Sequence, residues 1–141
     1  TNIIGMAAPD FVMKTGDGKK KKFSDFKGKY IYLNFENSYI DQTQKDLDVL
    51  VRFQNDYKKD LVILNVGLYD SQEAVLKLSQ RYGDKMYFML ADDSDALKSR
   101  YSIKSIPSFF LIDKDGNFLM TKGAEPTDEL RMLLQRIFKS N

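Results

Sequence analysis

The chain has 141 residues, of which 43% are hydrophobic and 30% charged. It is long enough for a single domain with a proper core, which we place at residues 1–141, and its composition is ordinary for a globular protein. The net charge of +2 gives no reason to expect binding to nucleic acid or to an anionic membrane. No apolar run approaches the roughly 18 residues of a membrane-spanning helix, so we expect no membrane insertion by this domain. The chain begins at Thr1 without a methionine, which leaves open that a leader or an upstream domain has been removed.

Two residue types are missing altogether. The absence of cysteine excludes disulfides, thiolate catalysis and cysteine-ligated zinc or iron–sulfur sites. The absence of histidine removes the usual general base, the Ser-His-Asp arrangement and the commonest transition-metal ligand. We therefore expect no metal site and no cofactor.

The first predicted element is a β-arm. Phe11–Met13 is typical of a short strand, and Gly16-Asp17-Gly18 is a turn signal. The four lysines Lys19–Lys22 follow this turn. They could attract phosphate or an acidic partner, but a solvated hairpin arm that discourages pairing at a sheet edge is the simpler interpretation.

The chain is organised around residues 30–47. Tyr30–Phe35 is rich in β-branched and aromatic residues and predicts a buried strand, which passes through Asn37 and Ser38 into a helix over Asp41–Tyr57. Asp41 and Gln44 at the start of this helix resemble a capping box. A strand that leads directly into a helix places the first helical turn at the carboxyl edge of a sheet, where catalytic sites are often built. The usual catalytic residue types are absent from this position.

Two more strand–helix units follow. Leu61–Val66 predicts a buried strand, and Asp70 with Glu73 predicts the start of a helix that reaches Tyr82. Met86–Leu90 predicts a third strand, and the acidic residues 92–95 open a short helix that runs to about Tyr101. This acidic cluster could bind a hard cation, but carboxylates also favour the first turn of a helix, and capping is the simpler interpretation.

The last part of the chain predicts a hairpin and a helix. Ser105–Ser108 interrupts the pattern before a strand at Phe109–Ile112, and an Asp-Gly turn joins that strand to Phe118–Met120. The turn resembles a calcium loop, but Phe118 stands where such a loop needs glycine. Pro126 is predicted to begin a final helix with apolar residues at helical spacing, namely Leu130, Leu133, Leu134 and Ile137. The order predicts an α/β fold with a mixed central sheet and helices on both faces.

Several short motifs, in this order and spacing, resemble the thioredoxin superfamily, specifically the TlpA/ResA-like thiol–disulfide oxidoreductases and their AhpC/TSA relatives. The matching segments are Ala8–Phe11, Phe23–Lys29, Leu33–Phe35, Tyr101–Ile103, Ile106–Ser108 and Phe110–Gly116. The resemblance implies a thioredoxin-like three-layer sandwich with an N-terminal β-arm. It also implies a cis peptide bond between Ile106 and Pro107.

The catalytic motif of the family is not present. Family members continue Leu-Asn-Phe with Trp-Ala-x-Trp-Cys-x-x-Cys, and here the Cys-x-x-Cys columns read Ile40-Asp41-Gln42-Thr43. Thiol–disulfide exchange needs a thiolate, and neither Ile40 nor Thr43 provides one. We therefore expect no redox or hydrolytic catalysis by this domain alone, and we name no catalytic residue.

What the resemblance leaves is the substrate-binding surface of the family. By resemblance, Tyr39, Ile40, Ile106, Pro107 and Phe109 could line an apolar groove that holds an extended peptide weakly. In the alternative interpretation, Phe109 belongs to the core and Ile106-Pro107 is only a rigid bend. The family is usually extracytoplasmic, which is the basis for expecting a periplasmic or envelope-anchored protein.

Three functions stay open from the sequence. The first is a redox-inactive module that binds a protein or peptide. The second is a domain that positions substrate for an oxidoreductase whose cysteines lie elsewhere. The third is a purely structural domain.

Overall fold

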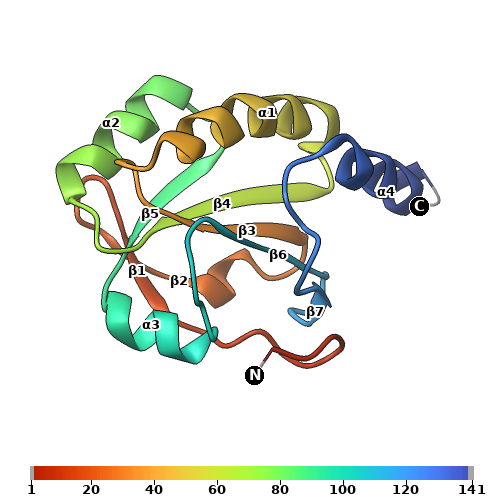
Figure 1. The fold of residues 1–141 in the computed structure, drawn as a ribbon, viewed down its shortest axis with the longest axis horizontal. Coiled ribbons are helices and arrows are strands. Elements are labelled where there is room, and N and C mark those ends of the chain that lie inside the picture. Colours follow the sequence, from red (N-terminus) through yellow and green to blue (C-terminus); the bar gives the residue numbers. More distant parts are fainter. Residues whose placement is uncertain (1, 140–141) are drawn as a thin grey trace.

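A computed structural model describes residues 2–139, which form one mixed β-sheet with helices on both faces (Figure 1). The strands are β1 (Val12–Thr15), β2 (Lys20–Lys22), β3 (Tyr30–Glu36), β4 (Leu61–Gly67), β5 (Tyr87–Ala91), β6 (Ser108–Ile112) and β7 (Phe118–Met120). The helices are α1 (Asp41–Tyr57), α2 (Gln72–Tyr82), α3 (Ser94–Arg100) and α4 (Asp128–Lys139), with a 3₁₀ turn, η1, at Phe23–Phe26.

The sheet has the strand order β2-β1-β5-β4-β3-β6-β7. The three central strands β3, β4 and β5 are parallel, as expected for strands joined through α1 and α2. The β1–β2 hairpin and the β6–β7 hairpin add antiparallel strands on the two sides. The predicted mixed sheet is therefore confirmed, and so is the hairpin at the Asp-Gly turn.

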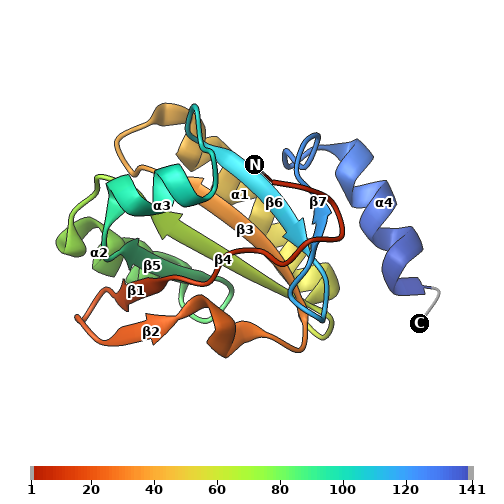
Figure 2. The same ribbon diagram turned by 90° about the horizontal axis from the view of Figure 1, so that it is seen from below.

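Two apolar cores lie on opposite faces of this sheet. One core packs α1, α2 and α4 against it and includes Tyr32, Leu47, Ile63 and Leu134. The other core packs α3 and the N-terminal arm against the opposite face, around Phe35 and Tyr101. Figures 1 and 2 show the resulting three layers, with the N-terminal segment running beside β7. The three-layer thioredoxin-like sandwich expected from the sequence is confirmed.

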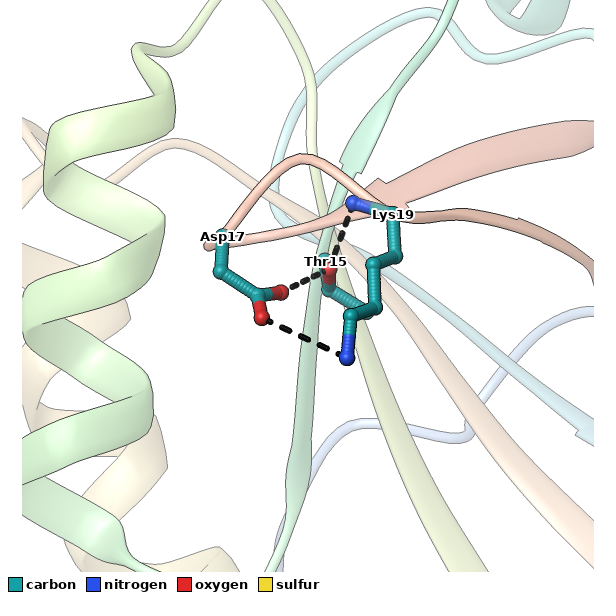
Figure 3. Close-up of polar contacts among 3 residues, drawn as sticks. All are labelled: Thr15, Asp17 and Lys19. Atoms are coloured by element: carbon teal, nitrogen blue, oxygen red, sulfur yellow. Dashed lines mark hydrogen bonds and ion pairs between the residues drawn. The ribbon is translucent and has the colours of Figure 1, made fainter.

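The lysine-rich hairpin lies at the edge of the sheet, and all three residues of β2 are exposed. Its turn is closed by side chains, because the Thr15 hydroxyl donates to Asp17 and accepts the backbone N–H of Lys19 at 2.9 Å (Figure 3). The Lys19 ammonium lies 3.8 Å from the Asp17 carboxylate. This arrangement is that of a solvated edge hairpin, as the sequence indicates.

Two predicted helix starts and one predicted cap are wrong in detail, whereas α1 has its predicted bounds. Asp41 does not cap α1, because Ile40 is the N-cap residue and no side chain accepts a hydrogen bond there. Helix α2 begins at Gln72 and is capped by Ser71, whose hydroxyl accepts the Ala74 N–H at 3.1 Å. Helix α4 begins at Asp128 rather than at Pro126, since the Thr127 hydroxyl accepts the Leu130 N–H at 3.2 Å.

The acidic cluster before α3 has a structural role. The Asp93 carboxylate accepts the Ala96 N–H at 3.0 Å and so caps the helix, while Asp92 lies 3.4 Å from the ammonium of Lys14 in β1. Over residues 2–139, no group of three or more carboxylates is arranged to hold a metal ion. Within the same residues, no helix is long and apolar enough to cross a membrane.

Candidate functional site

The carboxyl edge of β3 carries the loop where the family has its cysteines. Asn37 holds this loop together. Its side-chain amide donates to the carbonyls of Leu68 and Tyr69 at 2.9 and 3.2 Å, and its side-chain oxygen accepts the Tyr39 N–H at 2.9 Å. The Asn37 carbonyl accepts the Ile40 N–H at 3.1 Å. These hydrogen bonds attach the loop to the segment that follows β4.

A second set of bonds joins the same two loops. The Asp70 carboxylate accepts the backbone N–H of Ser38 at 2.7 Å and the Ser38 hydroxyl at 2.9 Å. It also accepts the Ser71 N–H at 2.8 Å, immediately before α2. The carboxylate thus connects the start of α2 to the loop that leads into α1.

The two positions of the lost cysteines differ in exposure. Ile40 is half-buried at the N-cap of α1 and belongs to neither apolar core. Thr43 is only 2% exposed, and its hydroxyl donates to the Asn37 carbonyl at 2.9 Å. The isoleucine side chain has no reactive group, and the threonine hydroxyl is engaged with a backbone carbonyl rather than with a base. A hydroxyl without an adjacent base is a poor nucleophile, so neither position offers catalysis.

Two tyrosines at this edge are exposed. Tyr39 is 77% exposed beside Ile40. Tyr69 is 53% exposed and adopts a left-handed backbone conformation with φ of 54°. Its N–H donates to the Ser94 hydroxyl at 2.9 Å and its hydroxyl donates to Asp95, so Tyr69 connects the edge to the start of α3. The sequence analysis did not select Tyr69, because only the structure shows that it is exposed.

Beneath this edge lies a buried polar group that the sequence analysis also missed. Glu36 ends β3 with 2% of its surface exposed, and its carboxyl accepts one side-chain hydrogen bond, from the amide of Asn34 at 3.0 Å. Asn34 also donates to the side chain of Asn65, its partner across β3 and β4, at 3.0 Å. Desolvation, followed by the negative charge of Asp70, raises the pKa of Glu36 to about 8. Glu36 occupies the column where the family has its first tryptophan. A charged residue in the place of a large aromatic one was the signal in the sequence that could have identified it.

The loop before β6 lies near the same edge. The Ile106–Pro107 peptide bond is cis. Ile106 is half-buried and packs against the core on the α3 side, while Phe109 is 8% exposed and stacks on Tyr32 at a centroid distance of 5.7 Å. Phe109 therefore has the core role of the alternative interpretation over most of its surface.

A groove of about 640 Å³ lies between this loop and the segment that joins β7 to α4. Its walls carry hydroxyl groups and lysines as well as apolar surface, and they include Ser105, Pro107, Ser108, Phe109, Lys104, Thr121, Lys122 and Glu125. Of the five predicted binding residues, Pro107 and Phe109 line this groove, whereas Tyr39, Ile40 and Ile106 are not among its lining residues. The groove is more polar than the apolar site predicted from the sequence.

Comparison with known proteins agrees with this geometry. Residues 4–119 match the model of the AhpC/TSA family. The chain is 30% identical over 136 residues to the thiol-disulfide oxidoreductase ResA of Bacillus thuringiensis, covering 95% of this chain and 78% of that protein. It is 28% identical over 129 residues to ResA of Bacillus subtilis, covering 89% of this chain and 70% of that protein.

Solved structures show the same fold. A candidate thiol-disulfide oxidoreductase from Bacteroides vulgatus superposes with a TM-score of 0.83 at 28% identity, covering 96% of each chain. A thiol:disulfide interchange protein from a Bacteroides species superposes with a TM-score of 0.83 at 21% identity, covering 98% of this chain and 91% of the other. The chain belongs to the AhpC/TSA family and is a TlpA/ResA-like protein of thioredoxin fold that has no cysteine.

Proposed function

We propose that this domain is a redox-inactive interaction module that binds an extended polypeptide in the groove beside Pro107. The groove itself, about 640 Å³ in volume, is the observation that carries the proposal. A cavity of this size accommodates several residues of an extended chain. Because the protein has no cysteine, occupancy of the groove cannot lead to thiol–disulfide exchange by this chain.

The backbone of the adjoining loop supports this assignment. Over residues 2–139, Ile106 makes no backbone hydrogen bond, so its N–H and C=O groups are free for an incoming strand. The neighbouring Ser105 carbonyl accepts the Ser108 hydroxyl, which holds the loop in place. An extended peptide that pairs with Ile106 would gain main-chain hydrogen bonds, while the groove walls would select its side chains.

Two apolar residues before α1 are candidates for further contact with the peptide. Tyr39, the most exposed large apolar residue among those described, and the half-buried Ile40 stand at the start of α1. Exposed apolar groups next to free backbone groups are typical of peptide sites. Since no covalent bond would form, we expect an affinity on the order of tens of micromolar or weaker. The likeness to ResA supports our further proposal that the protein lies outside the cytoplasm, in the periplasm or anchored at the envelope.

Chemical-shift mapping with a panel of extended peptides tests the proposal. We expect a binding peptide to shift the amides of residues 104–106, 108–110 and 121–125 together and to leave the outer face of α4 unchanged. Thr121→Trp should fill the groove and abolish these shifts. Met132→Trp is the matched control, because Met132 is 57% exposed on α4 and does not line the groove. Shifts that are scattered over the surface, or that persist in Thr121→Trp, would leave only a structural role.

A further inference from the structure

A second cavity, of about 390 Å³, lies at the opposite edge of the parallel strands. It forms because β4 extends beyond the start of β5. Leu64 is the first residue of β4 paired with β5, at Tyr87, so Leu61, Val62 and Ile63 have no partner on that side. Leu61 and Val62 line the cavity, and the segment before β3 and the end of α1 complete its walls.

The cavity gathers positive charge. Lys29 precedes β3, and Lys58 and Lys59 follow the last residue of α1, and all three are exposed side chains that line it. Over residues 2–139, none of the three lysines forms an ion pair. The lining holds one acidic residue, Asp84, against the three lysines, so its formal charge is +2.

A glutamine with an unpaired amide also lines this cavity. Gln54 is 9% exposed on the last turns of α1 and lines the cavity, yet its side chain has no hydrogen-bond partner within the part of the chain that the structure describes. Its amide atoms remain accessible to solvent. Because no protein group engages this amide, it can exchange its water for a ligand in the cavity.

One more donor is held in the lining. Tyr87 begins β5, and its ring packs edge-on against Phe26 at a centroid distance of 4.9 Å. The Tyr87 side chain is 48% exposed, and within the described residues its hydroxyl has no hydrogen-bond partner. The residues that line the cavity thus carry three ammonium groups, an amide and a phenol that no protein acceptor engages among the described residues.

We propose that this cavity binds a small multivalent oxyanion, a phosphate or a polycarboxylate. Lysine ammonium groups and neutral N–H and O–H donors are the partners that such anions use. The lysines alone would also suit the C-terminal end of the α1 dipole, which attracts cations. The dipole does not explain Lys29, which lies before β3 rather than at the end of α1. An oxyanion in the cavity accounts for all three lysines, because it would pair with each of their ammonium groups.

Titration of the ¹⁵N-labelled protein with inorganic phosphate and, separately, with citrate tests the proposal at constant ionic strength. We expect saturable shifts of the amides near Leu61, Val62 and Tyr87 with at least one of these anions, and none with chloride. Replacing Lys29, Lys58 and Lys59 by glutamine should weaken this binding by about tenfold or more. Gln54→Leu, which keeps the size and helical preference of the residue, should weaken it by about threefold or more.

The matched control changes the same charge elsewhere. Replacing Lys20, Lys21 and Lys22 of β2 by glutamine should leave the affinity within about twofold, because these lysines do not line the cavity. Shifts that rise linearly without saturation with both anions would overturn the proposal. Equal weakening in the two triple variants would also overturn it, since it would mean attraction by net charge alone.

Discussion

Asp70 binds Ser38 through both of its carboxylate oxygens, one on the backbone N–H at 2.7 Å and the other on the hydroxyl at 2.9 Å. The two residues belong to loops that follow neighbouring parallel strands, β3 and β4. In this protein, hydrogen bonds rather than a disulfide fix the loop that occupies the place of the family's active site.

The first prediction concerns this pair. Asp70→Ala should lower the free energy of unfolding by about 1–3 kcal/mol, because it leaves the Ser38 and Ser71 donors without their acceptor. Ser38→Ala removes only the hydroxyl bond and should cost about 1 kcal/mol. Urea denaturation of the two single variants and the double variant forms a thermodynamic cycle. Strictly additive losses would show that the two side chains are not coupled in solution.

The second prediction concerns the buried carboxyl of Glu36. Its pKa of about 8 in the folded protein is above the ordinary value of 4.5, so the folded state retains a proton that the unfolded state loses. The contribution of Glu36 to the free energy of unfolding is therefore constant below about pH 4.5. It falls by about 1.4 kcal/mol per pH unit between about pH 4.5 and about pH 8, and it is constant again above that.

Glu36→Gln tests this sign. Glutamine is neutral at every pH and keeps an oxygen for the Asn34 amide, so it should stabilise the protein by several kcal/mol at pH 8 and have little effect at pH 4.5. Urea denaturation at pH 5, 7 and 9 measures the difference, with the exposed Glu125→Gln as the control. A stability difference between Glu36→Gln and the parent protein that is the same at all three pH values would contradict the prediction.

The sequence was sufficient for elements whose signal is local. The apolar spacing of Leu47, Leu50 and Phe53 predicted α1 with its observed bounds. The Asp-Gly turn predicted the β6–β7 hairpin, because the signal for a tight turn also lies within a few adjacent residues. The predicted capping box at Asp41 failed because Asn37, outside the helix, fixes the loop that precedes the first turn.

The candidate site was less predictable, because its features depend on pairing between distant strands. Glu36 is charged and ends a strand, so only its place in the tryptophan column of the family, and nothing else in its local sequence, indicates that it is buried. Phe109 was assigned to a groove by resemblance, and its stacking on Tyr32 depends on the register of β3 and β6. The cavity with Gln54 depends on the different lengths of β4 and β5, which no local pattern shows.

The third prediction restores the cysteines of the family. The double change Ile40→Cys and Thr43→Cys should form a disulfide with oxidised glutathione, because the two positions already share a turn in which the Thr43 N–H donates to the Ile40 carbonyl at 3.0 Å. Mass spectrometry would detect the loss of two hydrogens. Two free thiols at equilibrium would mean that this turn does not match the Cys-x-x-Cys geometry.

An insulin reduction assay compares the redox activity of the parent protein with that of the double variant. The parent protein should not accelerate the reduction of insulin by dithiothreitol above buffer, since it has no thiol. The single variants Ile40→Cys and Thr43→Cys serve as controls for the pair, because neither can close an internal disulfide. Insulin reduction by the parent protein, from a preparation free of thioredoxin, would contradict the absence of redox activity.

The last prediction concerns Ile40 as the N-cap of α1. Its backbone angles, φ −90° and ψ 123°, are those of an ordinary N-cap, but its side chain cannot accept a hydrogen bond. Ile40→Ser would supply an acceptor for a free N–H of the first turn, whereas Ile40→Ala removes the same apolar side chain without supplying one. We expect the serine variant to be more stable than the alanine variant by about 1 kcal/mol, measured by urea denaturation.

The same two variants also test whether Ile40 contributes to peptide binding. If Ile40 contributes to the peptide site, both variants should bind a groove peptide more weakly than the parent protein, by about threefold or more, because both lose the apolar contact. The serine variant would then combine higher stability than its alanine control with weaker binding than the parent. That combination would explain why isoleucine occupies a position that favours a capping residue. Equal stability of the two variants, or unchanged peptide affinity in both, would show that Ile40 is neither an unfavourable cap nor a binding residue.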